Sequence, residues 1–148
     1  MISIELKTLV HPTEDEEIIK KSFRKIYPFD NFVIGAPNNR GVYEISVNAV
    51  GSQTLQYLFS QIRRQRTVET IHNYTQERLN PITNSCQFNI NKQALTMGFI
   101  VLSTEPNDSP LGPVSMTVFA KNIVSVMNYL FPNTQDGKVI EVDYRPNE

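Results

Sequence analysis

The chain has 148 residues, of which 40% are apolar, and a formal net charge of −1 at pH 7. Apolar residues spread along the whole chain are typical of one folded domain and exclude a disordered chain. The near-neutral balance argues against a strongly basic nucleic-acid binder, although binding depends on the local potential and not on the sum. Local clusters of charge therefore matter more than the total.

The cysteine content and the apolar runs of the sequence bear on where the protein is located. The single Cys86 excludes an internal disulfide, and its strand-like surroundings predict a small buried side chain. Glu5 and Lys7 interrupt the first apolar run, which is unlike a signal peptide. No run approaches the roughly 18 apolar residues of a membrane span. The sequence therefore predicts a cytoplasmic protein with no membrane partner.

A strand and a helix are predicted before Pro28. Residues 1–10 alternate apolar and polar side chains, which indicates a half-buried strand. Thr13 and Glu16 have the spacing of a capping box, so we expect Thr13 to cap a helix that stops before Pro28. This reading gives the acidic residues around Glu16 a structural role and makes a metal site there unnecessary.

Short strands at 32–34 and 42–50 precede a long helix that is predicted from about Ser52, its N-cap, to Leu79. An apolar stripe runs along the first half of this helix, formed by Leu55, Leu58, Phe59 and Ile62. The next apolar residues, Val68 and Ile71, fall on roughly the opposite side. The helix must therefore kink or change its packing partner halfway.

The second half of the chain predicts further strands at 85–91, 97–102, 114–119 and 139–144 and a helix at 120–131. Short connections between neighbouring strands favour antiparallel pairing. The fold class is therefore α+β, with one long and two shorter helices packed on one face of a mainly antiparallel sheet. We expect one domain over residues 1–148, with a core over about 1–132 and a C-terminal extension over 133–148.

Three arginines, Arg63, Arg64 and Arg66, gather where the helical stripe changes sides. Such a cluster is a candidate contact for phosphates. Arg63 and Arg66 are neighbours at i,i+3, but Arg66 has the same spacing to Glu69 and could form a structural ion pair instead. Phosphate contact, structural pairing and a protein interface all stay open for this cluster.

Catalytic patterns are absent from the sequence. His11 and His72 have no metal-ligand spacing with each other or with Cys86, and the glycines form no phosphate-binding loop. The sequence therefore predicts a protein that is not an enzyme and that needs no cofactor or metal.

Four short segments, in order, resemble an archaeal family of small uncharacterised proteins that is described as predicted RNA-binding and linked by prediction to the exosome. The segments are Val10-His11-Pro12-Thr13-Glu14-Asp15, Arg63-Arg64-Gln65-Arg66, Asn91-Lys92-Gln93-Ala94 and Ser109-Pro110-Leu111-Gly112-Pro113. The resemblance implies a fold similar to that of the ribosomal protein that binds 5S ribosomal RNA. It also implies RNA or a ribonucleoprotein complex as the partner.

The resemblance adds Lys92, with Asn91 and Gln93, as second-rank RNA contacts beside the arginines. The chain departs from the family pattern at two places. Thr70-Ile71 and then His72 stand where a pair of small residues and another arginine are usual, and Phe99 follows Gly98 where a basic residue is usual. Both departures remove positive charge and predict RNA binding that is weaker than in the relatives, or absent.

An alternative hypothesis is a protein-interaction module without RNA binding. Val68 and Ile71 need cover that the stripe of Leu55 and Ile62 does not share. A second copy of the chain, related by a two-fold axis, would supply that cover and make a homodimer.

Overall fold

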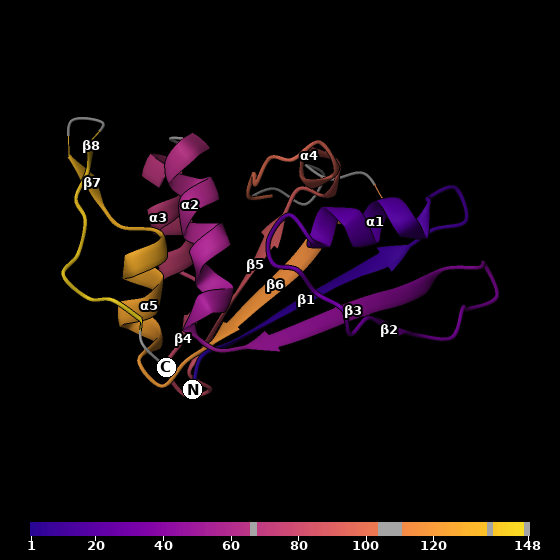
Figure 1. The fold of residues 1–148 in the computed structure, drawn as a ribbon, viewed down its shortest axis with the longest axis horizontal. Coiled ribbons are helices and arrows are strands. Elements are labelled where there is room, and N and C mark those ends of the chain that lie inside the picture. The colour runs from indigo at the N-terminus through magenta and orange to yellow at the C-terminus, as the bar shows by residue number, and fades with distance from the viewer. Residues whose placement is uncertain (66–67, 104–110, 136–137, 147–148) are drawn as a thin grey trace.

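A six-stranded sheet carries all the main helices on one of its faces (Figure 1). The computed structural model describes residues 1–65, 68–103, 111–135 and 138–146, and it leaves the side chains of 65 and 68–70 undescribed. The strand order is β2-β3-β1-β6-β5-β4, and every paired neighbour is antiparallel. The predicted α+β class with a mainly antiparallel sheet is confirmed.

The chain forms eight strands and five α-helices over the residues that the structure describes. The strands of the main sheet are β1 (Ser3–Val10), β2 (Val33–Ile34), β3 (Tyr43–Val50), β4 (Leu79–Asn80), β5 (Ser85–Ile90) and β6 (Val114–Phe119). The helices are α1 (Glu16–Phe23), α2 (Gln56–Gln65), α3 (Val68–Gln76), α4 (Lys92–Thr96) and α5 (Ile123–Leu130), with a 3-10 turn η1 (Ser52–Leu55) before α2. A small hairpin, β7 (Thr134–Gln135) and β8 (Lys138–Val139), follows α5.

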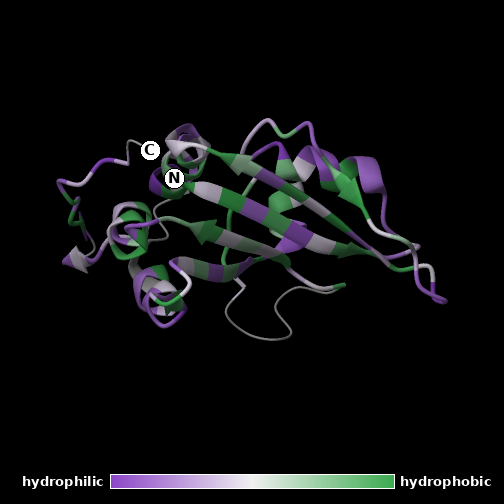
Figure 2. Cartoon of the chain, turned by 90° about the horizontal axis from the view of Figure 1, so that it is seen from below, coloured by the Kyte–Doolittle hydropathy of each residue, from purple (hydrophilic) through white to green (hydrophobic). Residues whose placement is uncertain are grey.

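The period-two pattern of the strands sets which face of the sheet is buried. On β1, Leu6 stands opposite Val47 of β3 and Met116 of β6, and all three are at most 2% exposed. Apolar and polar residues alternate along the strands when the sheet is viewed from its uncovered side (Figure 2). The apolar set therefore meets the helices, while the polar set stays in solvent.

The uncovered face of the sheet is polar and carries little free positive charge. Its residues on β1, β3, β5 and β6 are Ser3, Glu5, Lys7, Leu9, Glu44, Ser46, Asn48, Val50, Ser85, Gln87, Asn89, Ser115, Thr117 and Phe119. Lys7 is the only cation in this set, and its ammonium lies 3.3 Å from the carboxylate of Glu5. This face therefore offers a polyanion no net attraction.

The predicted long helix is divided into η1, α2 and α3. The residue before η1 is Gly51, not the predicted cap Ser52, and its φ of +112° is open to glycine because it has no Cβ. Ile71 on α3 is only 6% exposed within the single chain, and α3 contacts α5 and β5. Other elements of the same chain therefore bury Ile71, which agrees with the predicted change of packing partner. The side chain of Val68 is outside the described residues.

Three other predicted elements are wrong in detail. Asp15, not Thr13, caps α1, and its carboxylate accepts from the backbone N–H of Glu17 at 2.9 Å. The strand predicted at 97–102 reduces to one isolated bridge between Ile90 and Leu102, because α4 and its turn take up the first of those residues. The edge strand predicted at 139–144 is replaced by the β7–β8 hairpin.

Cys86 and Phe88 lie in the core with no exposed area, as their strand pattern predicts. Burial raises the pKa of the Cys86 thiol to about 11, so the thiol stays protonated near neutral pH. No helix within the described part of the chain is long and apolar enough to cross a bilayer.

Candidate nucleic-acid interface

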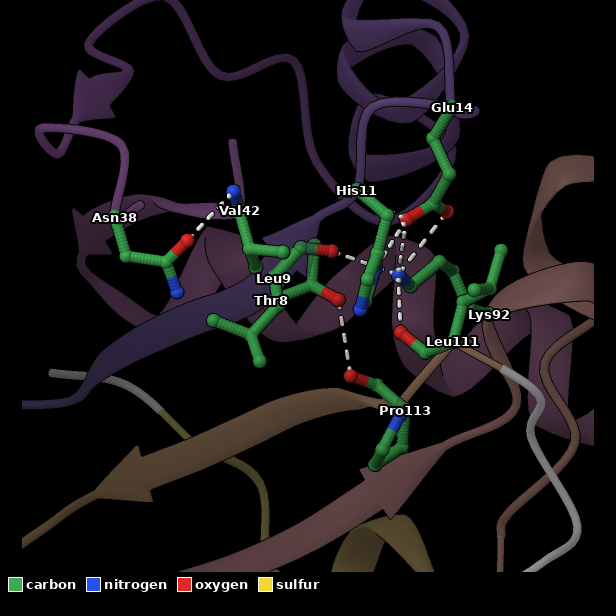
Figure 3. Close-up of polar contacts among 9 residues, drawn as sticks. All are labelled: Thr8, Leu9, His11, Glu14, Asn38, Val42, Lys92, Leu111 and Pro113. Atoms are coloured by element: carbon green, nitrogen blue, oxygen red, sulfur yellow. Dashed lines mark hydrogen bonds and ion pairs between the residues drawn. The ribbon is translucent and has the colours of Figure 1, made fainter. Parts of the chain in front are cut away.

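Lys92 is a buried cation at the meeting point of three segments (Figure 3). It is 1% exposed, and its ammonium donates to the carbonyl oxygens of Leu9 at 2.7 Å and Leu111 at 3.0 Å. The same ammonium lies 3.1 Å from each carboxylate oxygen of Glu14. Three of the segments that carry the family resemblance, those of Glu14, Lys92 and Leu111, therefore contribute to one buried centre, which we call the Lys92 centre.

Glu14 is held in this centre by His11, just after β1 ends. The backbone N–H of His11 donates to Oε1 of Glu14 at 3.0 Å, and the ring Nδ1 lies 2.9 Å from the same oxygen. Burial raises the pKa of the Glu14 carboxyl, but the hydrogen bonds from His11 and Lys92 outweigh it and hold the pKa below its ordinary value of 4.5. Burial also lowers the pKa of Lys92, against the opposing effect of Glu14. The pair is a structural ion pair that ties β1 to α4.

Asn91 has a local structural role beside Lys92. Its side-chain oxygen accepts from the backbone N–H of Ala94 at 2.9 Å, which caps α4. Gln93 follows on the first turn and is half-buried. The segment from 91 to 94 therefore begins a helix and directs Lys92 inward.

Arg63 occupies a second inward-facing centre, between α2 and the end of α5. Its guanidinium donates to the carbonyl oxygens of Leu130 at 2.9 Å and Tyr129 at 2.8 Å, which lie in the last turn of α5. It also forms a two-pronged pair with Glu141, with both N–O distances at 2.9 Å, and lies 4.2 Å from the ring centre of Phe59. We call this group the Arg63 centre. It fastens the segment around Glu141 to α2.

The opposite side of α2 is exposed. Leu58 and Ile62 face the core at 0% and 1% exposure, whereas Tyr57 is 55% exposed and Arg64 is also exposed. Tyr57 and Arg64 are seven residues apart, so they point in nearly the same direction, about 10 Å apart along the helix axis. This outer side of α2 presents an aromatic ring and a cation together.

A second exposed basic surface lies at the C-terminal end of α1. Lys20 pairs with Glu16 at 3.1 Å and with Glu17 at 3.6 Å, whereas Lys21 and Arg24 are exposed. The α1 helix begins with acidic residues and ends with basic ones, an order that suits its dipole. The chain therefore has a local basic area at this end of α1, although its net charge is close to zero.

Comparison with known families identifies the chain. Residues 3–119 match the model of a protein family described as "RNA binding". The chain belongs to this family. The matched range runs from β1 through β6 and includes the Lys92 centre and all of α2.

Similar archaeal proteins align with the chain over most of its length. A UPF0201 protein of Thermococcus onnurineus is 30% identical over 142 residues, which cover 93% of this chain and 97% of the relative. A UPF0201 protein of Sulfurisphaera tokodaii is 28% identical over 138 residues, which cover 93% and 92%.

Solved structures of similar proteins have the same fold. A UPF0201 protein from Methanococcus jannaschii superimposes with a TM-score of 0.79 at 20% identity, over 94% of this chain and 99% of that one. A DUF54 protein from Methanothermobacter thermautotrophicus superimposes with a TM-score of 0.66 at 13% identity, over 87% and 96%. At these identities the likeness concerns the fold alone.

The described residues among those predicted to bind RNA do not form one surface. Lys92 is buried and Arg63 is turned toward α5, so neither presents its charge to solvent as predicted. Asn91 is a helix cap, Arg64 is exposed, and Arg66 lies outside the described residues.

Sequence reasoning missed the basic end of α1 and did not join Tyr57 to Arg64. Tyr57 and Arg64 are seven residues apart, on the side of α2 opposite its apolar stripe. This helical spacing could have predicted from the sequence that the two residues lie on the same side. For α1, the signal was the run of four cations, Lys20, Lys21, Arg24 and Lys25, after an acidic first turn.

Proposed function

We propose that this chain is a non-enzymatic RNA-binding protein that contacts backbone phosphates through the outer side of α2. The match of residues 3–119 to a family described as "RNA binding" is the observation that carries this proposal. The proposed contact is made by charge and shape, so we expect binding to weaken as salt rises.

Arg64 supports the location on α2. It is exposed beside Arg63, whose guanidinium is fixed to α5 and Glu141, so that part of α2 is held firmly while Arg64 stays accessible. Tyr57, 55% exposed, stands on the same side and can stack on a base. Arg66 belongs to the same predicted cluster, and its contact with RNA remains a prediction from the sequence.

The uncovered face of the sheet is less suited to RNA. Lys7 is paired with Glu5, and Glu44 adds a second carboxylate to that face. A polyanion approaching there would meet a net negative surface. The helical side, with Arg64 on α2 and the basic end of α1, therefore favours RNA more.

The predicted likeness to the ribosomal 5S-RNA-binding protein and the predicted link to a ribonucleoprotein complex remain predictions. The homodimer hypothesis loses one of its two motives, because Ile71 is already covered within the single chain. RNA binding by a monomer is therefore the function that we place first.

The test measures fluorescence anisotropy of a labelled structured RNA at low and at moderate salt. Wild type is compared with Arg64→Ala and Arg64→Lys. The matched control is Arg40→Ala, which removes an exposed arginine from the turn between β2 and β3. We expect Arg64→Ala to weaken binding several-fold and to lower the salt slope by about one, because one phosphate contact is lost.

Arg64→Lys should retain most of the binding, since the charge remains, and Arg40→Ala should bind as wild type does. Equal losses in Arg64→Ala and Arg40→Ala would indicate attraction by overall charge and contradict a site on α2. The absence of wild-type binding to structured and unstructured RNA, even at low salt, would refute the proposed function.

A further inference from the structure

Two large apolar side chains stand exposed in the turn that follows α4. Met97 is 75% exposed and Phe99 is 54% exposed. Figure 1 shows α4 beside α1 on the helical side of the sheet, and on α1 Ile18 is 51% exposed. Met97 and Phe99 therefore place apolar surface on the helical side of the sheet, where α4 contacts α1.

The turn that carries Phe99 is rigidly hydrogen-bonded. The backbone N–H of Phe99 donates to the carbonyl of Ala94 at 2.9 Å, and that of Gly98 donates to the carbonyl of Leu95 at 3.0 Å. Gly98 has a φ of +93°, which is the left-handed conformation of a Schellman motif. The backbone at Phe99 is thus fixed, so binding at its ring requires no further ordering of the main chain there.

One cation, Lys25, which follows the end of α1, lies against this turn. The ammonium of Lys25 donates to the carbonyl of Thr96 at 2.7 Å, and a Cβ placed on Gly98 would lie 3.9 Å from the same nitrogen. On α1, Lys21 follows Ile18 at i+3, so the two lie on one side of that helix, and Lys25 follows two residues after its last residue, Phe23. Within the part of the chain that the structure describes, no carboxylate lies within ion-pair distance of Lys21 or Lys25.

We propose that Phe99, with Met97 and the cations Lys21 and Lys25, forms a stacking site for an unpaired base of single-stranded RNA. The inference rests on the proposed function and adds the class of RNA. An exposed aromatic ring stacks on the flat face of a base, and neighbouring cations meet the phosphates on either side. A base inside a duplex is already stacked on its neighbours and cannot use the ring.

The chemistry of Phe99 also predicts low sequence preference. A phenyl ring has no donor or acceptor to read the edge of a base, and every base has a π face. Charge complementarity favours a polyanion over a neutral partner, because Lys25 lies against the turn and Lys21 is exposed on α1, which contacts α4. The site therefore suits unpaired RNA of any sequence.

The experiment uses the full chain and two labelled RNAs, one short and unstructured and one fully paired. Wild type is compared with Phe99→Ala, Phe99→Tyr and the control Phe119→Ala, which removes a ring 39% exposed on the uncovered face of the sheet. We expect Phe99→Ala to weaken binding of the unstructured RNA about tenfold and to leave the paired RNA unchanged. Phe99→Tyr should bind as wild type does, because the ring is kept.

A base analogue such as 2-aminopurine in the unstructured RNA gives a direct readout. Its emission should be quenched on binding to wild type and not on binding to Phe99→Ala. If Phe99→Ala binds and quenches as wild type does while Arg64→Ala is impaired, the stacking site is refuted and the proposed function stands. If wild type binds neither RNA, both proposals fail.

Discussion

Lys92 and Arg63 are both cations that the sequence marked as RNA contacts, and both turn inward, but they do so in different surroundings. Lys92 is 1% exposed, and its partner Glu14 is 12% exposed at the side chain. The side chain of Arg63 is 16% exposed, and that of its partner Glu141 is 50% exposed. The first pair is withdrawn from water, whereas the second stays at the edge of the solvent.

The difference teaches how a cation is held when water is excluded. The Lys92 ammonium has three donors and finds Leu9, Leu111 and Glu14 around it, which satisfies a compact point charge. Arg63 uses its planar fork on Glu141 and on two carbonyls of the last turn of α5. Losing a partner should be costly in the Lys92 centre and moderate in the Arg63 centre.

The largest effect is expected from Glu14→Gln. This change leaves the buried Lys92 ammonium without its counter-charge, so we expect unfolding free energy to fall by about 3–5 kcal/mol. Urea unfolding monitored by circular dichroism measures the loss. The matched control is Glu17→Gln, three residues along the chain in the first turn of α1, at a side chain 68% exposed, for which a change within about 0.5 kcal/mol is expected.

A similar small loss in both variants would mean that Lys92 is readily hydrated or neutralised, and the contrast with Arg63 would disappear. Lys92→Met in the Glu14→Gln background tests whether the uncompensated charge of Lys92 causes this loss. It removes the stranded charge and should recover part of the lost stability.

The Arg63 centre should give a smaller effect. Arg63→Ala removes two hydrogen bonds to carbonyls, the pair with Glu141 and the contact with Phe59, so we expect a loss of about 2 kcal/mol. Arg64→Ala, one residue along α2, should change stability by at most about 0.5 kcal/mol. Thermal or urea unfolding of the two variants separates a structural arginine from an exposed one. Equal stability of both would contradict the role given to Arg63.

The smallest effect is expected at Glu141. Glu141→Gln should cost at most about 1 kcal/mol, and less at high salt, because the carboxylate is half exposed. The hydrogen bond from Arg63 holds the pKa of Glu141 below its ordinary value of 4.5. The pair therefore stabilises the fold above about pH 4.5 and loses this contribution as the pH falls through the lowered pKa. Unfolding of wild type and Glu141→Gln across this acid range should converge, and a constant gap would contradict the assignment.

Much of the sheet could be predicted because its strands obey a period of two. Residues 85–90 and 114–119 alternate so clearly that both strands were correctly predicted. The strand predicted at 97–102 was wrong because Asn91 caps a short helix and Gly98 ends it, and apolar Met97 and Phe99 stand in the turn. An apolar run does not distinguish a buried strand from an exposed turn.

The site was harder to predict, because exposure of a charged side chain depends on contacts distant in sequence. Lys92 is buried by Leu9 and Glu14, 83 and 78 positions away, and Arg63 by carbonyls 66 and 67 positions away. Neither contact has a local signature. The exposure of Arg64 can be predicted from the helical period alone, because the apolar stripe lies on the other side of α2.

The position of β1 between β3 and β6 has a consequence for folding during synthesis. Ser3 pairs with Val50 on one side and with Phe119 on the other, so β1 is made first and receives its second neighbour last. Until residues 114–119 leave the ribosome, one edge of β1 has unpaired amides and carbonyls and an uncovered apolar face. Closure of the sheet is a late, long-range event, so folding should be slower than in a helical protein of this length and most open to aggregation just before β6 is added.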